Sequence, residues 1–463
     1  MLKKYNFANQ KIFNMFPIII FSVFVLGYLT IVFEHPLKLD KTVPTLIMGS
    51  VMWALLSIGF HNGFLDVVDS HEHLWSIATG HSAEEGFTNS LLHHLGKTAE
   101  ILVFLIGAMT IVEIIDLHKG FEVLKEYVTT KKKVKLLWII GILAFILSAI
   151  IDNLTATIVL VTLLRKLIDS KKERLWFAGL VVVAANAGGA WSPIGDVTTT
   201  MLWIGNKVSA SGLISHLVLP SILSFIVPFT IAGFLPVFKG EITSEIKEDG
   251  NTELRKLLSS KTMLILGLSA IVFVPIFKVF THLPPYLGMM LSLGVVWLVS
   301  EFIHPEEKFD ESQRHLYTGL KALSRIEMSS ILFFLGILMA VAAIETLATH
   351  DMGTLRYLAE NLQESIPDQN IVVMILGVLS AVIDNVPLVA ASMGMYQFPM
   401  DHEIWHFIAY AAGTGGSMLI IGSAAGVAAM GMEKIDFIWY LKNISWLALV
   451  GYLAGAGLFL LLL

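Results

Sequence analysis

The sequence predicts an all-α, polytopic membrane protein made of two inverted repeats, each with five membrane spans. Only 15% of its 463 residues are charged and 55% are hydrophobic, whereas about 25% of the residues in ordinary soluble proteins are charged. Apolar runs near 20 residues recur along the whole chain, and each is long enough to cross a hydrocarbon core of about 30 Å. Short motifs also recur in the same order in the two halves. These observations exclude an ordinary soluble enzyme.

The composition excludes several other functional classes. The formal net charge is −6, and the sequence has no long stretch of basic residues that could bind a phosphate backbone, so we expect no nucleic-acid partner. Cysteine is absent, so disulfides, thiolate metal sites and cysteine nucleophiles are impossible. The apolar run 16–33 follows three lysines, as in a signal peptide, but no small-residue cleavage site comes after it. We therefore expect this run to be the first span.

The apolar stretches give the order of the elements. Those of the first repeat, which we place at 1–237, are 16–33, 43–60, 98–117, 136–150, 154–168, 176–205 and 212–237. Those of the second repeat, which we place at 262–463, are 262–279, 285–302, 329–348, 370–383, 386–398, 403–430 and 443–463. The residues between the repeats, 238–261, contain several Lys and Arg residues, which predicts a cytoplasmic linker.

Two pairs of these stretches are too short to span a bilayer, and an Asp-Asn dipeptide joins each pair. The first pair, 136–168, has several Lys and Arg residues on both flanks, which places both flanks in the cytoplasm. The second pair, 370–398, has mostly acidic flanks, which predicts that both are external. A short pair that enters and leaves on one side is a re-entrant hairpin, whose tip must be surrounded by protein or by a water-filled cavity.

Matching motifs identify the repeats. The hairpin motif Ser148-Ala-Ile-Ile-Asp-Asn153 recurs as Ser380-Ala-Val-Ile-Asp-Asn385. Downstream, the stretches 176–205 and 403–430 are each interrupted by three glycines, which we expect to break the helices: Gly188, Gly189 and Gly195, then Gly415, Gly416 and Gly422. Five full crossings in one repeat is an odd number, so the second repeat is inverted relative to the first.

Three carboxylates lie within apolar sequence. Asp152 and Asp384 are at the two hairpin tips, and Asp196 follows the first glycine break, where the second break has Ser423. An ionisable residue at membrane depth costs about 2.5 kcal/mol or more on insertion scales. Helix capping is one explanation, because Asp accepts hydrogen bonds from the free N–H groups of a helix start. Ion binding is the other, because paired interruptions in inverted repeats mark the transport site near the membrane midplane.

The residue types favour a cation. Carboxylates, amides, hydroxyls and carbonyls released at a helix break bind small hard cations, and the nearest basic residues are Arg165 and Lys207. We predict Na+ binding at Asp152, Asp196 and Asp384, with Asp152 and Asp384 exchanging Na+ for H+ and Asp196 as a third ligand or proton site. The predicted neutral ligands or supports are Asn153, Thr155, Asn186, Ser192, Thr198, Thr199, Asn385, Ser417 and Ser423.

Na+ and H+ would compete for the same oxygens, because burial disfavours a charged carboxylate and a neighbouring cation favours it. A site that crosses by alternating access only with Na+ or H+ bound makes an antiporter, which needs no cofactor. Glu100 and Glu327 begin the third span of each repeat and are either proton relays or interfacial ends. The predicted external loop 61–96 contains histidines that either sense pH or form a polar surface: His61, His71, His73, His81, His93 and His94.

At these residues the sequence resembles the NhaD-type sodium/proton antiporters of the ion transporter superfamily. The resemblance rests on Asp152-Asn-Leu-Thr155, on Asn186-Ala-Gly-Gly-Ala-Trp-Ser-Pro-Ile-Gly-Asp-Val-Thr-Thr199 and on Gly416-Ser417 through Gly422-Ser423. It implies exchange of Na+, and also Li+, for H+ by an inner-membrane homodimer with a scaffold and a moving transport part. Dicarboxylate symporters of this superfamily carry Ser-Asn-Thr at hairpin tips, where this chain has Asp-Asn. Na+-coupled symport of a small anion such as a dicarboxylate is the alternative, and a channel or sensor is a more distant one.

Overall fold

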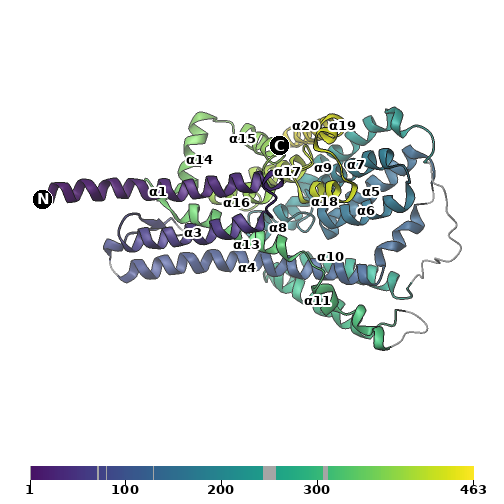
Figure 1. Ribbon diagram of the computed structural model, residues 1–463, viewed down its shortest axis with the longest axis horizontal. Helices are drawn as coiled ribbons and strands as arrows, with labels where there is room; N and C mark the ends of the chain where they lie inside the picture. The colour runs from purple at the N-terminus through teal and green to yellow at the C-terminus, as the bar shows by residue number, and fades with distance from the viewer. Residues whose placement is uncertain (1, 70–71, 80, 129, 243–256, 306–310) are drawn as a thin grey trace. The chain divides into compact units, whose positions relative to one another are not determined.

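A computed structural model describes residues 2–69, 72–79, 81–128, 130–242, 257–305 and 311–463. The described chain is mostly helical (Figure 1), and its strands form two short antiparallel pairs. Nine helices in this part of the chain are long and apolar enough to cross a membrane, which confirms the predicted polytopic helical class. Most of the predicted linker 238–261, and also His71, lie outside the described residues.

The chain divides into two compact units, and each unit draws on both halves of the sequence. The first unit contains residues 1–102, 327–371 and 386–398, and the second contains residues 103–326, 372–385 and 399–463. Both units therefore combine segments of the two predicted repeats. The boundaries and the inversion of those repeats stay predictions.

The first unit is built around α3 and α13. Its elements are α1 (Leu2–Val32), α2 (Glu34–Leu37), α3 (Thr42–His61), β1 (Val67–Val68), β2 (Leu74–Trp75), η1 (Ile77–Thr79), the first part of α4 (His81–Leu117), α13 (Met328–Thr346), β3 (Ala348–Thr349), β4 (Met352–Gly353), α14 (Thr354–Ser365) and most of α16 (Asn385–Met395). β1 pairs with β2, and β3 pairs with β4.

Small residues let α3 and α13 approach closely. A Cβ atom on Gly49 would lie 2.8 Å from the carbonyl oxygen of Gly336, so the two backbones meet where neither has a side chain. Trp53 Nε1 donates a hydrogen bond to the carbonyl oxygen of Met339 (2.8 Å). This bond satisfies the indole N–H between the helices, where an unpaired polar group would be costly.

The second unit contains the hairpin tips and the glycine breaks. Its elements are the last part of α4, η2 (Gly120–Tyr127), α5 (Lys133–Ile151), α6 (Asn153–Leu167), α7 (Lys171–Gly189), α8 (Val197–Ile204), α9 (Ala210–Phe234), η3 (Pro236–Phe238), α10 (Ser260–Thr281), α11 (Pro285–Phe302), η4 (Glu311–Leu316), α12 (Gly319–Leu323), most of α15 (Gln369–Leu379), α17 (Glu403–Gly415), α18 (Ala424–Glu433), α19 (Phe437–Asn443) and α20 (Ser445–Leu462).

Helices α4 and α5 are longer than the sequence predicts. α4 begins at His81 rather than near residue 98, so the second half of the predicted loop 61–96 is helical. The added turns are rich in Ser, Glu, Asn and His, which a search for apolar runs passes over. α5 begins at Lys133 and has 19 residues, so it is long enough to span a membrane by itself, contrary to the prediction for 136–150. Lysines can extend an apolar helix because their stems lie on apolar surface while their charges reach water.

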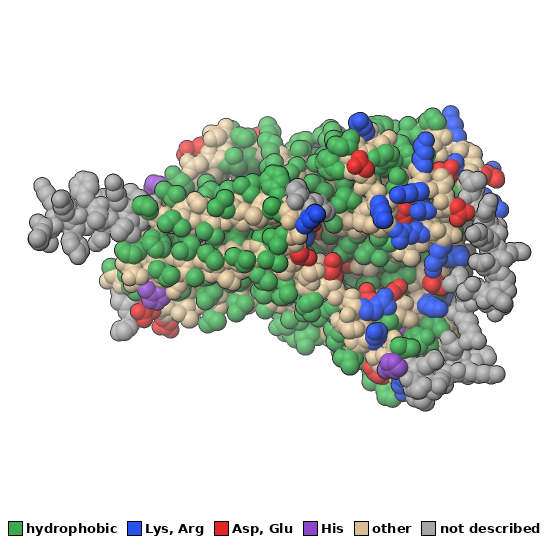
Figure 2. Space-filling model, in the orientation of Figure 1, with side chains coloured by type: hydrophobic (Ala, Val, Ile, Leu, Met, Phe, Trp, Pro, Cys, Tyr) green, Lys and Arg blue, Asp and Glu red, His purple; other side chains and the backbone are tan. Residues whose placement is uncertain are grey.

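α5 and α6 form a hairpin that turns at Asp152, whose φ is +80°. The two helices pack against each other. Lys133 at the start of α5 forms an ion pair with Glu173 at the start of α7 (Nζ to Oε1, 2.8 Å), and α7 follows directly after α6. Both ends of the hairpin therefore lie at one end of the second unit, where Figure 2 shows Lys and Arg side chains gathered. That the hairpin is re-entrant stays a prediction.

The structure breaks both glycine-rich helices where the motifs predict. The first break separates α7 from α8, and the second separates α17 from α18. In each half a serine of the hairpin motif is bonded to the helix before the break. Ser148 Oγ donates to the carbonyl oxygen of Ala185 (2.5 Å), and Ser380 Oγ donates to that of Ala412 (2.9 Å). The same contact thus joins hairpin and broken helix in both halves.

Candidate ion-binding site

Asp196 lies at the first helix break with only 2% of its surface exposed. It is the N-cap of α8, and its Oδ1 accepts a hydrogen bond from the backbone N of Thr198 (3.1 Å). The start of a helix carries partial positive charge, which stabilises a carboxylate there. The capping role that the sequence allows for Asp196 is therefore real, but it occupies only one of the two carboxylate oxygens.

The other oxygen belongs to a buried polar network. Asp196 Oδ2 accepts hydrogen bonds from Nδ2 of Asn153 (3.0 Å) and from Nδ2 of Asn385 (3.4 Å). Asn153 Nδ2 also donates to Oδ1 of Asn186 (2.9 Å), and Asn186 Nδ2 donates to Oγ of Ser423 (2.9 Å). All of these side chains are buried and lie in the second unit. The network brings together both predicted hairpin tips and both helix breaks.

Glycines give the breaks their close backbone contacts. In each half, the Gly-Gly pair lies directly against backbone carbonyl groups that a Cβ atom would approach too closely. The four residues are Gly188, Gly189, Gly415 and Gly416. The third glycines of the motifs, Gly195 and Gly422, provide the carbonyl oxygens that face Gly189 and Gly416. The predicted helix-break glycines are thus required for space.

Two residues of this region are not among the predicted ones. Gly413 precedes its Gly-Gly pair by two residues, as Asn186 does in the first motif, and a Cβ atom on it would lie 3.8 Å from Asp196 Oδ2. Aligning the two motifs would have found it. Tyr440 is fully buried, and its OH donates to the carbonyl oxygen of Ser417 in the second break (2.8 Å). Nothing in the motif pattern points to Tyr440.

Asp152 caps the second arm of the first hairpin. Its Oδ1 accepts a hydrogen bond from the backbone N of Thr155 (2.8 Å), and its Oδ2 accepts one from the Thr155 hydroxyl (2.9 Å). The side chain is half-buried. Both carboxylate oxygens are therefore turned toward the start of α6, and Thr155 acts as the support of Asp152.

Asp384 is half-buried between α15 and α16. The negative charge of Asp384 repels that of Asp196, and the negative charge of Asp196 repels that of Asp152. Within the described residues, however, no three His, Cys, Asp or Glu side chains come close enough together to hold a metal ion. The three aspartates therefore do not form one cluster in the described structure, and a Na+ site with all three as ligands stays a prediction. One reason is that the oxygens of Asp152 face Thr155 instead.

Comparisons with known proteins give the family. Residues 28–405 match the family model described as citrate transporter. The chain is 44% identical to sodium/proton antiporter 1 of Arabidopsis thaliana over 441 residues, which are 95% of this chain and 71% of that protein. It is 30% identical to the Na+/H+ antiporter NhaD of Alkalimonas amylolytica over 463 residues, with 95% of this chain and 89% of that protein covered. The chain belongs to the NhaD-type branch of the citrate transporter family.

A solved structure has a similar fold. The YdaH transporter of Alcanivorax borkumensis aligns with a TM-score of 0.54 and 12% sequence identity, covering 91% of this chain and 97% of that one. At this identity the similarity concerns the fold alone. As a member of the NhaD-type branch, the protein is a transporter rather than an enzyme, and it is a multi-pass protein of the plasma membrane.

The remaining predicted neutral residues, Ser192, Thr198, Thr199 and Ser417, are buried, and most of them serve the local backbone. Thr199 Oγ1 donates to the carbonyl oxygen of Asp196 (2.9 Å), and Ser417 Oγ donates to that of Thr414 (2.7 Å). Ser192 Oγ accepts a hydrogen bond from the backbone N of Ile194 (3.4 Å). These hydroxyls shape the two breaks, whereas Asn153, Asn186, Asn385 and Ser423 form the network around Asp196.

The predicted relay residues belong to the first unit. Glu100 is half-buried on α4, and its Oε2 lies 3.8 Å from Nζ of Lys97. Glu327 is exposed at the start of α13 and accepts a hydrogen bond from Oγ of Ser330 (3.0 Å). These surroundings fit the interfacial alternative, and a relay role stays a prediction.

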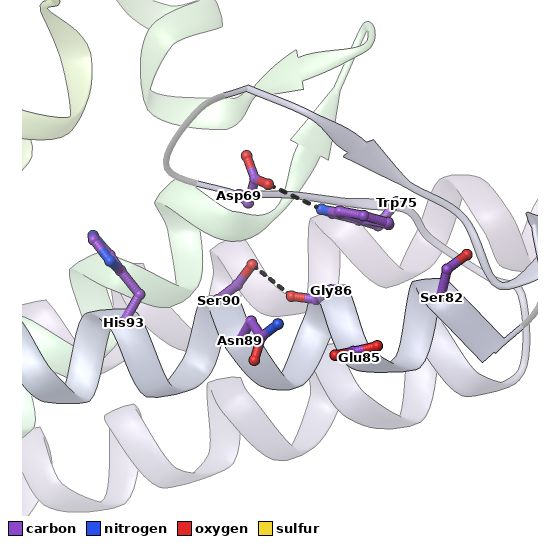
Figure 3. A pocket seen from close by; sticks show the side chains of 8 residues that line it. All are labelled: Asp69, Trp75, Ser82, Glu85, Gly86, Asn89, Ser90 and His93. Atoms are coloured by element: carbon purple, nitrogen blue, oxygen red, sulfur yellow. Dashed lines mark hydrogen bonds between the residues drawn. The ribbon is translucent and has the colours of Figure 1, made fainter.

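The histidine-rich segment contributes to a cavity in the first unit (Figure 3). The cavity has a volume of about 290 Å³ and is lined by Asp69, Trp75, Ser82, Glu85, Gly86, Asn89, Ser90 and His93. Trp75 Nε1 donates to Asp69 Oδ2 (3.2 Å), and Ser90 Oγ donates to the carbonyl oxygen of Gly86 (2.9 Å). None of these lining residues is a predicted cation ligand. His61 ends α3, while His93 and His94 lie within α4 rather than in a loop.

The basic residues that lie nearest in sequence to the hairpin tip and the first break contact other groups than Asp196. Nε of Arg165 and Nε of Arg174 each lie 2.7 Å from the carboxylate of Glu433, whose side chain is 1% exposed. Lys207 has its Nζ 4.8 Å from the ring centre of Trp405. In the described chain, no Lys or Arg forms an ion pair with Asp196. The groups bonded to its carboxylate in the described structure are N–H donors.

Proposed function

We propose that the protein exchanges Na+, and also Li+, for H+ across the membrane by alternating access, with Asp196 binding either ion. The observation that carries the proposal is the buried carboxylate of Asp196, which amide groups join to both hairpin tips and, through Asn186, to Ser423 in the second break. The names of the relatives support the choice of ions, because the proteins at 44% and 30% identity are called sodium/proton antiporters.

The electrostatics of Asp196 support competition between the two ions. A buried carboxylate at membrane depth is costly unless its charge is compensated. The N–H donors and the start of α8 compensate for part of this charge. A proton or a Na+ ion would complete the compensation, and both would use the same oxygen lone pairs. Binding of one ion therefore requires release of the other, which is the coupling that antiport needs.

Na+ binding would require the amide groups to turn. Asn153 and Asn385 present Nδ2 to Asp196, whereas a hard cation binds oxygen. Rotation of each terminal amide by half a turn would present Oδ1 instead, because the two ends of an Asn amide exchange donor for acceptor. The charges of Asp152 and Asp384 would then draw the cation toward Asp196. In this proposal the tip aspartates act through their charge, with Asp196 as the shared ligand.

Vesicles that hold a pH gradient test this proposal. Addition of NaCl should dissipate the gradient in vesicles that contain the wild-type protein. Asp196→Asn should reduce the response at least about 100-fold, because it removes the exchangeable charge. Glu122→Gln is the matched control, because Glu122 pairs with Lys166 in a partly exposed ion pair and should leave the response unchanged. A full Na+ response in folded Asp196→Asn protein would contradict the proposal.

The second candidate is Na+-coupled symport of a small anion. It is favoured by the description of the matching family model as a citrate transporter. An anion site normally uses Arg or Lys, whereas Asp196 is negatively charged and no Lys or Arg of the described chain forms an ion pair with it. Na+-driven uptake of labelled citrate without any proton response in the same vesicles would establish symport instead of antiport.

A further inference from the structure

His406 is a fully buried histidine near the start of α17. Within the described structure, neither of its ring nitrogens has a hydrogen-bond partner. Its Nε2 nevertheless lies 3.5 Å from Oδ1 of Asp401. Its ring stacks on that of His216 in α9, with ring centres 4.4 Å apart and planes inclined by 11°. A buried imidazole without hydrogen bonds is costly, and such exceptions call for an explanation.

Asp401 is held in place from two sides. Its Oδ1 accepts a hydrogen bond from the backbone N of Ser209, the N-cap of α9 (2.7 Å), and its backbone N donates to the carbonyl oxygen of Lys207 (2.9 Å). A Cβ atom on Gly212 would collide with Oδ1 of Asp401 and lie 3.0 Å from Cε1 of His406. The start of α9 therefore packs directly against both members of the pair.

The other titratable groups around His406 are few. His216 has its Nδ1 bonded to the carbonyl oxygen of Gly212 (2.8 Å), so that nitrogen carries a proton. The segment of His406 itself contributes His402 and Glu403, and the loop before α9 contributes Lys207. α8 and α20 contain no Asp, Glu, His, Lys or Arg, and the charged residues of α7 are confined to its first four positions. Asp401 is thus the anion nearest to the ring.

We propose that His406 is a second proton-binding site, which shares its proton with Asp401 and lowers the turnover of the exchanger when it is protonated. A proton on Nε2 would convert the 3.5 Å contact into a charge-assisted hydrogen bond. The carboxylate of Asp401 would also pair with the positive charge of the protonated His406 ring, which is unfavourable in a buried place without an anion. The proposal rests on the Na+/H+ exchange proposed above.

The consequence for transport follows from the position of His406. His406 lies on α17, which ends at the second helix break, whereas Asp401 is bonded to the start of α9. Protonation therefore fastens α17 to α9 and slows any step in which the two helices move against each other. Protons that compete with Na+ at Asp196 raise the KM for Na+. A proton at His406 lowers kcat instead, so the two sites separate kinetically.

The experiment measures Na+-dependent proton movement in proteoliposomes as a function of Na+ concentration at a series of pH values. In the wild type we expect KM to rise and kcat to fall toward acid pH, with kcat falling at most about tenfold per pH unit for one proton. In His406→Phe, which keeps the stacked ring, and in His406→Gln, kcat should stay constant within about twofold while the rise of KM remains. Asp401→Asn should move the fall of kcat to lower pH, because it removes the anion that stabilises the protonated ring. His282→Gln is the control, since His282 is exposed at the end of α10.

The outcomes separate this inference from the proposed function. Absence of Na+-dependent proton movement in the wild type would overturn both. Exchange by the wild type with an unchanged kcat profile in His406→Gln and Asp401→Asn would overturn only the role of His406. If His406→Phe fails to fold, the other two variants decide. Nitrogen-15 spectra of histidine-labelled protein give a direct reading: the signal absent from His406→Gln should titrate in the wild type over the range in which kcat falls, and a signal that stays neutral there overturns the proposal.

Discussion

Asp196 in the first helix break and Ser423 in the second occupy equivalent places, and each caps the helix that follows. Asp196 accepts a hydrogen bond from the backbone N of Thr198 (3.1 Å), and Ser423 accepts one from that of Gly426 (3.2 Å). The backbone arrangement of the two breaks is thus duplicated, whereas the charge is present in one break alone. The comparison teaches that the repeated backbone builds the cradle, and that the side chains which differ decide where an ion can bind.

A second difference lies two residues before each Gly-Gly pair. The first half has Asn186, whose amide reaches across to Ser423, and the second half has Gly413, which leaves space beside Asp196. The first half therefore supplies both the charge and the amide that links the breaks. If both breaks contributed equally, substitutions at equivalent places would have equal effects.

Removal of Asn186 should have the largest effect after removal of Asp196. In Asn186→Ala, one N–H of Asn153 loses its acceptor, because Asn153 Nδ2 donates to Asn186 Oδ1. A buried donor left unsatisfied costs about 1–3 kcal/mol, so we expect KM for Na+ to rise about tenfold or more in the vesicle assay. Ser423→Ala should raise KM less, because it removes a cap worth about 1 kcal/mol and the link to Asn186. A larger effect of Ser423→Ala would contradict the unequal roles of the two breaks.

The sequence is informative about the breaks because their polar and glycine residues differ from the apolar residues around them. Charged or glycine-rich positions within apolar runs stand out, and Asp196, Asn153 and Asn186 are all identified from the sequence. The same reasoning could not decide between binding and capping for Asp152, because both roles use an Asp at a helix start. Only the fold shows that its oxygens face Thr155.

Other features lack a sequence signal for physical reasons. The first turns of α4 are polar, and in α14 polar residues separate the apolar ones, so a search for apolar runs detects neither segment. His406 lies within an apolar run, and its proximity to Asp401 and His216 depends on a contact between α17 and α9 that no motif encodes.

The two halves also differ in where the helix after the break has its buried carboxylate. In the first half Asp196 caps the start of α8, whereas in the second half Glu433 ends α18. Nε of Arg165 and Nε of Arg174 each lie 2.7 Å from its oxygens. Glu433→Gln would leave two arginines without a charged partner. We expect the free energy of unfolding to fall by about 1–3 kcal/mol, and no more, because the partly exposed Arg165 can turn toward water. Thermal unfolding in detergent measures this loss. Glu122→Gln is the control, because a surface pair is worth at most about 1 kcal/mol. Loss of exchange by Glu433→Gln without loss of stability would show that the charge serves transport rather than structure.

The smallest effect concerns His118, which lies outside both breaks and outside the membrane spans. Its Nδ1 is within hydrogen-bond distance of Oγ of Ser259 (2.8 Å), and its carbonyl oxygen accepts a hydrogen bond from Oγ of Ser260 (2.7 Å). Burial lowers the pKa of His118 from 6.5 to about 4. Because the folded pKa is below the unfolded value, the stability that the neutral ring provides is complete above pH 6.5 and is lost as the pH falls toward 4.

The loss should be at most about 1.4 kcal/mol per pH unit, and it should be near zero at neutral pH. Thermal unfolding at a series of pH values should show a flatter acid side for His118→Gln than for the wild type, while the exposed His282→Gln keeps the wild-type slope. Equal slopes in all three proteins would mean that another group unfolds the protein in acid. The acid dependence of unfolding must be measured before a loss of exchange in acid is assigned to protonation of Asp196. A smaller amount of folded protein lowers the exchange rate just as a proton on Asp196 does.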